Sequence, residues 1–353
     1  MTTANAEQPA TLGAGDTDHQ AAFVSALQGL HAPSPLIYWT DLLVSSGAGW
    51  TAFAVAVSSR NTVVTVVALT ISMILLYRAH LFIHELSHAA RRIGGFSAVW
   101  NLVAGFPLLV PAFFAVGVHR DHHRPDTYGT ADDPEYLPFG HSRALIVRFL
   151  LLTIAFPWLM AIRLLLLAPI AMVVPKLQQY LERRASSLAM NPAFIRTVEL
   201  AEHRAIMRQQ LGAMALWAPI IGFLATGQWP LRTVAFWGIV ATVIALINGL
   251  RALGAHRYLG DGAVFDREAQ REDSIDTPGR WWTTIWAPVG HRYHALHHYA
   301  PGLPYHNLAV AYRRLLALRT PLDERFRRTT SPGLAPSLST LWTTAGGYDD
   351  SSV

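Results

Sequence analysis

The chain has 353 residues, of which 52% are hydrophobic and only 14% are charged. Soluble domains carry about 25% charged residues, so this composition indicates a lipid environment and excludes a large soluble domain. Cysteine is absent, which excludes disulfides, cysteine-ligated zinc and cysteine-ligated iron–sulfur clusters. The net charge of +5 comes almost entirely from arginines beside apolar segments, which favours a membrane surface over nucleic acid as the partner.

The long apolar segments predict an all-α integral membrane bundle. Residues 37–57 and 62–83 are each near the ~20 residues that span a bilayer, and the polar turn 58–61 joins them into a helical hairpin. Residues 211–226 and 230–250 form a second apolar hairpin. Two hairpins place both termini on one side, and most arginines fall on that side. The sequence therefore predicts cytoplasmic termini.

Two further apolar stretches contain prolines and are expected to be re-entrant or interfacial. Residues 96–118 contain Pro107 and Pro111 and separate two histidine clusters. If this stretch crossed the membrane, the clusters would lie on opposite sides and could not share a site. Residues 144–174 contain Pro157 and Pro169, and proline disrupts helix interiors.

Polar segments are expected at both ends of the membrane domain. Residues 1–36 read as a polar, partly disordered tail, without the apolar core of a secretory signal peptide. The membrane domain is expected over residues 37–318, and a second polar tail over residues 319–353.

Histidines gather at the ends of the apolar segments. Twelve of the 16 fall in four places. These are His80-Leu-Phe-Ile-His84-Glu-Leu-Ser-His88, then His119-Arg-Asp-His122-His123, then the lone His256, and finally His291-Arg-Tyr-His294-Ala-Leu-His297-His298 followed by His306.

The histidine spacing indicates metal binding. On a helix, residues three and four apart share a face, so His84 and His88 can face one metal, and each His-x-x-His-His box can present its first histidine beside the later ones. Eight or nine imidazoles are too many for one metal and imply two. Imidazole suits iron, copper, zinc and nickel. Oxidation of an unactivated C–H bond needs a redox metal, which zinc is not, so the pattern favours iron.

These boxes resemble those of the membrane fatty acid desaturase and hydroxylase family, which carries HxxxH, HxxHH and HxxHH boxes. The resemblance covers residues 37–318 and is closest to bacterial desaturases. It rests on His84-Glu-Leu-Ser-His88, on His119-Arg-Asp-His122-His123 with Tyr128-Gly129-Thr130 and Asp133-Pro134-Glu135, and on His294-Ala-Leu-His297-His298 with Pro304-Tyr305-His306-Asn307-Leu308.

The resemblance implies a cytoplasmic cap, at a bacterial inner membrane, whose histidines hold two irons. It also implies O2 as co-substrate, electrons from an external donor such as a ferredoxin, and a fatty acyl or lipid chain between the helices. No catalytic residue beyond the metal centre is expected. The implied ligands are His84, His88, His119, His122, His123, His256, His294, His297 and His298. Some members place a water-holding Asn four residues before the additional histidine, where this chain has Ala252.

Several residues near the boxes are further candidates. His80, His291 and His306 flank the boxes and are candidate additional ligands or substrate contacts. Ligating imidazoles usually donate to a carboxylate. Asp121 and Asp261 are the main candidate acceptors, and the sequence also offers Glu85, Asp132 and Asp133.

Alternative functions remain open at this point. Desaturation and hydroxylation begin with the same hydrogen abstraction, and the second box together with the Pro304–Leu308 tail favours desaturation. His84-Glu85-x-x-His88 also matches the HExxH motif of zinc proteases, with Glu85 as base, but that interpretation leaves both HxxHH boxes unexplained. A metal transporter would carry its histidines within the spans rather than at their ends.

Overall fold

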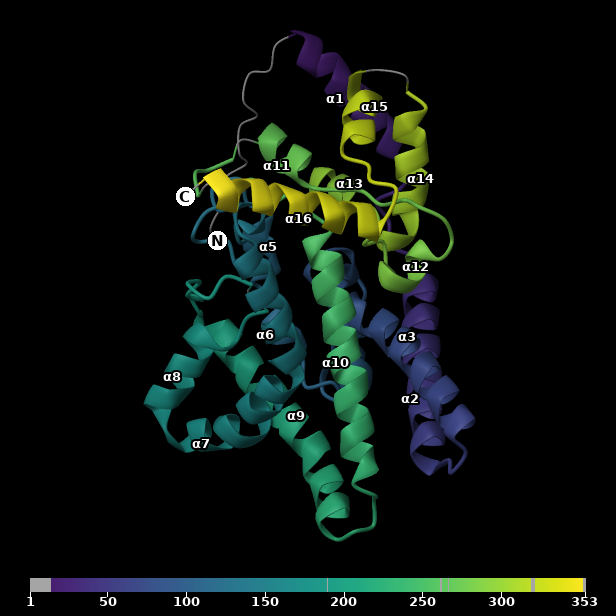
Figure 1. Ribbon diagram of the computed structural model, residues 1–353, viewed down its shortest axis with the longest axis vertical. Helices are drawn as coiled ribbons and strands as arrows, with labels where there is room; N and C mark the ends of the chain where they lie inside the picture. Colours follow the sequence, from purple (N-terminus) through teal and green to yellow (C-terminus); the bar gives the residue numbers. More distant parts are fainter. Residues whose placement is uncertain (1–13, 189, 261, 266, 319–320, 352–353) are drawn as a thin grey trace.

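The computed structural model describes residues 14–353 apart from 189, 261, 266, 319–320 and 352–353. Within these residues the chain is helical, with isolated bridges in place of strands. Figure 1 shows long helices in the lower part and a cap of short helices and loops above them. The prediction of an all-α membrane bundle is confirmed.

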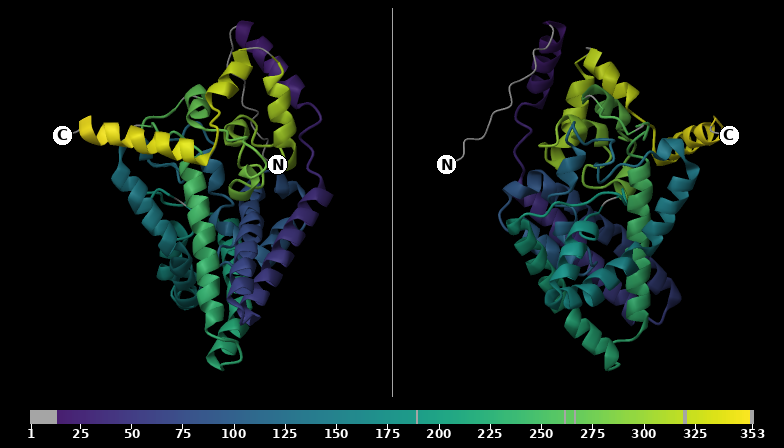
Figure 2. Two further views of the ribbon diagram at one scale, coloured as in Figure 1. Left: turned by 45° about the vertical axis from the view of Figure 1, so that its right-hand side comes forward. Right: turned by 90° about the vertical axis from the view of Figure 1, so that its left-hand side faces the viewer.

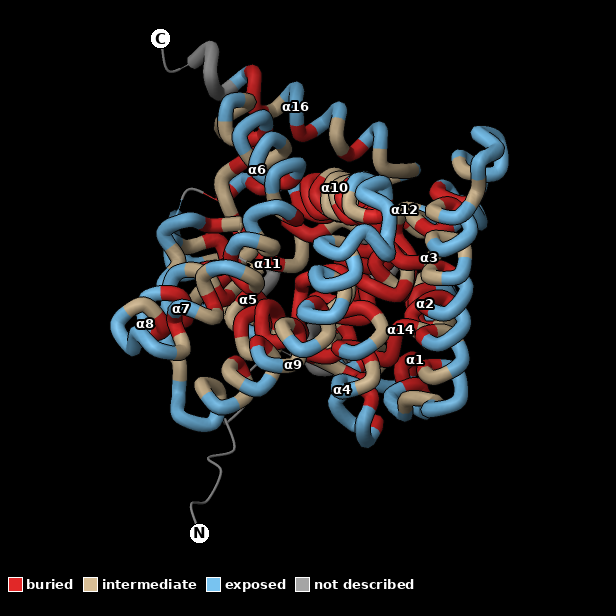
Figure 3. The backbone as a smooth tube through the Cα atoms, turned by 90° about the horizontal axis from the view of Figure 1, so that it is seen from below, coloured by how far each residue is buried: buried red, intermediate tan, exposed pale blue. Residues whose placement is uncertain are grey.

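Four helices are long and apolar enough to cross a membrane: Pro35–Ser58, Thr62–Ser87, Arg143–Val173 and Arg232–Leu253. Large apolar side chains stay exposed on their outer faces, among them Val63, Leu151 and Leu166. Seen from below in Figure 3, buried residues gather between the helices while exposed residues line the outside. This distribution is the one expected of a bundle whose outer surface contacts lipid.

The first hairpin consists of α2 (Pro35–Ser58) and α3 (Thr62–Ser87), as predicted. Asn61 begins α3 because its side chain accepts hydrogen bonds from the backbone of Val63 and Val64 at 2.9 and 3.2 Å. The two helices approach closely at Gly49, where an added Cβ would lie 2.8 Å from Leu76. This packing fixes α3, whose upper end carries the first histidine box.

The second hairpin consists of α9 (Leu200–Ala225) and α10 (Arg232–Leu253), joined by a short turn at the bottom of Figure 1. Trp217 of α9 and Trp237 of α10 pack edge to face, with ring centroids 5.1 Å apart. Both indole N–H groups donate to carbonyls of the segment after α4, Phe106 and Pro107. The hairpin thereby holds that segment inside the bundle.

Residues 96–118 form short pieces instead of a spanning helix. The α4 helix (Phe96–Trp100) continues as one π-helical turn to Gly105, and a turn and a 3-10 helix (Ala112–Phe114) follow. Ten helical residues rise about 15 Å, half of a ~30 Å hydrocarbon core. The first and second histidine boxes therefore lie on the same side, as predicted.

Residues 143–173 form a longer helix than the prolines suggest. The α6 helix (Arg143–Ala161) passes Pro157, widens into a π-helical turn and continues as α7 (Ala168–Val173). Membrane helices tolerate proline because neighbouring groups satisfy the freed carbonyl. This 31-residue stretch is long enough to cross a membrane, whereas the sequence suggested a re-entrant or interfacial element. In Figure 1 the chain bends at α7, and α8 (Pro175–Arg184) returns upwards.

The cap contains short helices that carry or cover the histidine boxes. These are α5 (His119–His122), α11 (Arg267–Asp273), α12 (Thr283–Trp286), α13 (His294–Tyr299), α14 (Tyr305–Leu316), α15 (Pro321–Arg328) and α16 (Leu334–Ser351). Near the N-terminus, α1 (Ala14–Leu27) packs on α14 through Leu27 and Leu315. Figure 2 shows α16 extending sideways from the cap, where Leu341 and Ala345 pack near Phe139.

Candidate metal centre

The histidine boxes meet in the cap, where two long helices end and two short helices pack. Box one lies in the last turn of α3 and just beyond it, and box two lies on α5. Box three forms α13, and His256 follows the end of α10 at Leu253. Helices that start far apart in the sequence thus deliver their histidines to one place.

One group contains five histidines whose ligand atoms all lie within 4.8 Å of one another: His84, His88, His119, His123 and His297. The His84 ring lies 4.5 Å from His119 and 4.4 Å from His297, measured between centroids. His84 Nδ1 and Nε2 and His88 Nε2 are buried without a hydrogen-bond partner among the described residues. Buried nitrogen atoms that converge without partners are the arrangement a metal ion would satisfy.

A second group contains four histidines: His122, His256, His294 and His298. All four are buried. The Nε2 atoms of His256 and His294 lie 2.7 Å apart, and those of His294 and His298 lie 3.2 Å apart. The two groups adjoin each other, since the ring centroids of His123 and His298 are 4.4 Å apart.

The HxxHH spacing explains how two adjacent groups form from two short helices. In each box the first and last histidines, four residues apart, share a group, whereas the middle one joins the other group. Box two gives His119 and His123 to the five-histidine group and His122 to the four-histidine group. Box three divides the other way: it gives His294 and His298 to the four-histidine group and His297 to the five-histidine group.

The nitrogen separations fit metal coordination. With metal–nitrogen bonds of about 2.0–2.1 Å, neighbouring ligand nitrogens lie about 2.9 Å apart at right angles and about 3.4 Å apart in a tetrahedron. The facing Nε2 atoms of His119 and His123 are 3.0 Å apart, and those of His123 and His297 are 3.1 Å apart. Both histidine groups therefore have the chemistry and the size to hold a metal ion each.

Carboxylates orient the second box. His119 Nδ1–H donates to Glu135 at 2.8 Å, and His122 Nδ1–H donates to both oxygens of Asp133 at 3.0 Å. Asp133 is completely buried and also accepts from the backbone N–H of Gly129. A proton held on Nδ1 leaves the Nε2 lone pair of each imidazole facing its group.

A tyrosine performs the same task for His256. His256 Nδ1–H donates to the Tyr128 hydroxyl at 2.8 Å, and that hydroxyl donates to Asp273 at 2.7 Å. Tyr128 is fully buried, and Asp273 is nearly so. The chain from carboxylate through phenol to imidazole fixes the His256 ring with Nε2 towards His294.

The protonation states of four histidines in the cap suit metal binding. Burial, reinforced by neighbouring histidines, lowers the pKa well below its usual range in His123, His294, His297 and His298. Neutral imidazole is the form that ligates metals. Although burial opposes it, the nearby His119 lowers the pKa of Glu135 to about 2. Burial alone would lower the pKa of His122, but the Asp133 carboxylate raises it.

The three flanking histidines lie outside both groups. His291 donates from Nδ1 to the Pro288 carbonyl at 2.9 Å and lies beside His84, with ring centroids 4.7 Å apart. His306 accepts from the Ser34 backbone N–H through Nε2 and donates to Asn307 through Nδ1. Both His306 nitrogens are thus occupied, and the bond to Ser34 holds the start of α2. His80 faces a cavity below the cap instead.

Of the acidic residues proposed to hold the histidines, one does so and another does not. Asp121 pairs with Arg124 at 3.9 Å, and its side chain makes no hydrogen bond to a histidine within the described ranges. Asp261 lies outside the described residues. Asp133 does accept from a histidine, whereas Glu135 and Asp273 were not anticipated. The Asp133-Pro134-Glu135 loop was visible in the sequence, but Asp273 comes from α11 without any local signal.

Glu85 has a different neighbour from the one a zinc protease requires. The Tyr38 hydroxyl donates to Glu85, which is 1% exposed and faces α2 rather than open space. The nearest His84 nitrogen is 4.0 Å away. A general base must reach a water or substrate, and this carboxylate is enclosed.

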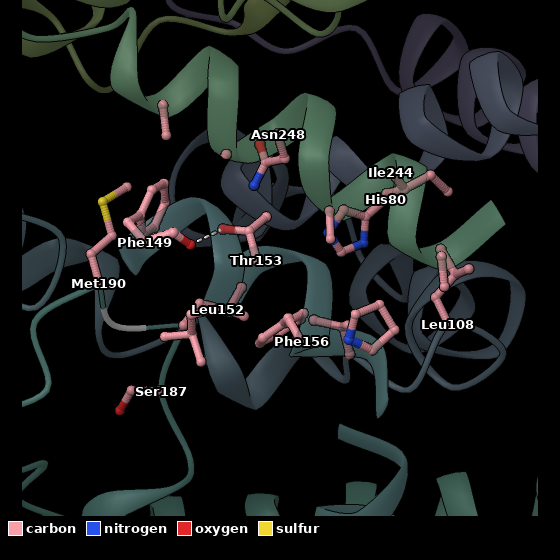
Figure 4. Close-up of a pocket in the computed structure, with 17 residues that line it drawn as sticks. His80, Leu108, Phe149, Leu152, Thr153, Phe156, Ser187, Met190, Ile244 and Asn248 are labelled. Carbon is pink, nitrogen blue, oxygen red and sulfur yellow. Dashed lines mark hydrogen bonds between the residues drawn. The ribbon is translucent and has the colours of Figure 1, made fainter. Parts of the chain in front are cut away.

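A cavity of about 150 Å³ lies below the cap between α3, α6 and α10 (Figure 4). Its walls include Phe149, Phe156 and Ile244, and it reaches Ala252. Ala252 is the position where the resemblance described above led us to look for an asparagine.

Comparison with known proteins places these features in a family. A family model described as fatty acid desaturase matches residues 60–329. A ceramide hydroxylase of Caulobacter vibrioides (strain NA1000 / CB15N) is 37% identical over 324 residues, which cover 90% of this chain and 92% of that protein. No solved structure shows a significant match. The chain belongs to the membrane fatty acid desaturase family, whose members are lipid-oxidising enzymes.

Proposed function

We propose that this chain hydroxylates a lipid of the ceramide class with O2, at a di-iron centre held by nine histidines. The observation that carries the reaction class is the pair of adjacent histidine groups above an apolar cavity. The 37% identical relative is a ceramide hydroxylase, which supports hydroxylation and a ceramide substrate.

The five-histidine group would hold one iron and the four-histidine group the other. Two irons bound there would activate O2 for attack on an unactivated C–H bond, which protein side chains cannot achieve. The chain itself supplies the rest. Glu135, Asp133 and Tyr128 hold protons on the outer imidazole nitrogens, and burial of the cap excludes water.

Desaturation is the second candidate, because it begins with the same hydrogen abstraction. The sequence features that favoured it were the second box and the Pro304–Leu308 tail. In the structure Tyr305 donates to Asp41 at 2.6 Å, and Asn307 donates to the Leu30 carbonyl at 2.7 Å. Since these contacts tie α14 to the N-terminal segment, the tail has a structural role and favours neither reaction.

Electrons would come from an external carrier such as a ferredoxin, since the chain has no cysteine for a cluster of its own. A second cavity, of about 460 Å³, connects the buried His256 with exposed Arg257 and Arg328 on the cap. This basic surface near a candidate ligand suits an acidic carrier. The proposal includes a bacterial inner membrane, with the cap and both termini cytoplasmic.

The reaction is tested by expressing the chain in a host that makes ceramides and analysing the lipids by mass spectrometry. Hydroxylation adds one oxygen atom, whereas desaturation removes two hydrogen atoms. We expect the oxygenated product and about two irons per purified chain. His122→Ala and His297→Ala, one from each group, should each abolish the product.

His31→Ala is the control, because His31 is exposed and lies outside both groups. It should leave the product and the iron content unchanged. Full activity in both His122→Ala and His297→Ala would refute the assigned ligands. One zinc and no iron in the active protein would refute the oxidase.

A further inference from the structure

The cavity below the cap has a wall of small side chains on one helix and a wall of aromatic rings on another. On α10, small residues face it at helical spacing: Ala241, Ala245, Gly249 and Ala252. Opposite them, Phe149 and Phe156 of α6 enclose the space (Figure 4). Small side chains on one helix and aromatic rings on the other leave a slot suited to a hydrocarbon chain.

His80 is the exceptional member of this lining. It is 7% exposed, and its buried Nδ1 has no hydrogen-bond partner within the described chain. Its nearest ring neighbour is Trp100, at 6.3 Å between centroids. Burying an imidazole nitrogen without a partner costs free energy, because the hydrogen bond that it made to water in the unfolded chain is not replaced. Asn248 also lines this cavity, but the carbonyl oxygen of its side chain already accepts from Arg251.

Two residues of the cavity lining precede members of the histidine groups in the sequence. His80 precedes His84 of the five-histidine group by four residues on α3, a rise of about 6 Å. Ala252 precedes His256 of the four-histidine group by the same number of residues. A group bound at His80 would therefore lie within a few bonds of a carbon that faces the metal centre.

We infer that His80 hydrogen-bonds a polar group of the lipid substrate, an amide or a hydroxyl, and so selects a polar-substituted chain and places oxidation near that group. This inference rests on the proposed function and deepens it. A plain hydrocarbon or mid-chain substrate would leave the imidazole unpaired. A ceramide carries both an amide and hydroxyls next to its chains, and thus supplies the missing partner.

Two other roles for His80 make different demands on the structure. A metal ligand should converge with the other ligands, yet His80 belongs to neither histidine group. A residue that only fills space needs no nitrogen, and phenylalanine would serve equally. The test therefore compares His80→Phe, which keeps a ring, with His80→Asn, which keeps a hydrogen-bonding group.

The experiment measures binding without turnover. The iron-loaded full chain in nanodiscs is titrated anaerobically with a fluorescent short-chain ceramide, and in parallel with an equally labelled alkane. His80→Phe should bind the ceramide about tenfold more weakly, the effect of one lost hydrogen bond, and the alkane as well as the wild type does. His80→Asn should recover part of the ceramide affinity. Under turnover, the wild-type hydroxyl should lie close to the polar end of the chain.

Thr233→Val is the matched control. Thr233 resembles His80 in being buried with an unpartnered polar group, its hydroxyl. It lies on α10, however, and lines a different cavity. It should leave ceramide affinity unchanged. Equal weakening of both probes by His80→Phe, or loss of iron from that variant, would overturn the inference. If the wild type binds ceramide and His80→Phe binds it equally, this inference fails alone. If the wild type does not bind ceramide, the proposed substrate fails as well.

Discussion

Asp133 is the side chain on which the geometry of the four-histidine group most depends. It is completely buried and holds the His122 Nδ1 proton with both carboxylate oxygens. We expect Asp133→Asn to weaken metal retention by about 10- to 100-fold, the usual effect of losing such an acceptor. The measurement is iron per chain during titration with a chelator.

Asp121→Asn provides a matched control, because the same change is made beside the same box. Asp121 is partly exposed and pairs with Arg124 instead of a histidine. Iron retention should therefore equal that of the wild type. A larger loss from Asp121→Asn than from Asp133→Asn would contradict the observed hydrogen bonds.

A second buried carboxylate links stability to pH. Asp276 accepts from the Leu296 backbone N–H at 3.2 Å, its other oxygen has no partner among the described residues, and burial raises its pKa to about 7. The folded protein thus holds this proton more tightly than the unfolded chain, whose aspartate pKa is about 3.9. The free energy of folding that this proton contributes is fully present below pH ~4 and is lost as the pH rises towards ~7.

Thermal unfolding in detergent measures this effect. Between pH 5.5 and pH 8, the unfolding midpoint of the wild type should fall relative to that of Asp276→Asn, which carries no titrating proton. The cap histidines, whose lowered pKa values give the opposite slope, contribute equally to both proteins. Asp126→Asn should retain the wild-type pH dependence, because Asp126 is exposed and pairs with Arg124. An unchanged pH dependence in Asp276→Asn would disprove the assignment.

The sequence predicts ligand residues better than the groups that orient them. His84, His122 and His297 are recognisable because boxes of helical spacing place several imidazoles on one face. Glu135 and Asp273 depend on how a loop and α11 fold back over the boxes, which local spacing does not encode. His80 has the spacing of a ligand, yet the cavity beside it gives it a different environment.

At the scale of elements, α2 and α3 meet most closely at Gly49. Its added Cβ would lie 2.8 Å from Leu76, whereas Gly47 has nothing within 4 Å. Gly49→Ala should therefore lower the unfolding midpoint, since overpacking costs about 1–3 kcal/mol. Gly47→Ala is the control on the same helix. It should leave the unfolding midpoint unchanged or raise it slightly, because alanine stabilises a helix interior by up to about 1 kcal/mol relative to glycine. Equal effects at both positions would contradict the packing.

Helix boundaries followed the hydropathy pattern where composition alone sets them, as in α2, α3 and α10. They departed from it where packing intervenes. Pro157 suggested an interruption, but the helix passes it and widens further on into the π-helical turn Ile162–Leu167. Residues 96–118 stayed short because α9 and α10 hold their carbonyls, which provides the partners that irregular backbone needs inside a bundle.

At the scale of the whole molecule, the proposed orientation predicts which positions face each side of the membrane. The turn between α9 and α10 and the cap lie at opposite ends of the bundle (Figure 1). Because the chain has no cysteine, single cysteines can be introduced without background. Gln228 in the turn and Ser339 on α16 are both exposed.

With the cap in the cytoplasm, a membrane-impermeant maleimide added to intact cells should label Gln228→Cys and not Ser339→Cys. Permeabilised cells should label both, and the wild type should stay unlabelled in each case. Arginine clusters on the cap side drive this orientation, because cytoplasmic loops retain positive charge during insertion. The reverse pattern would place the cap and its histidine groups outside, away from a cytoplasmic electron carrier, and would refute the proposed location.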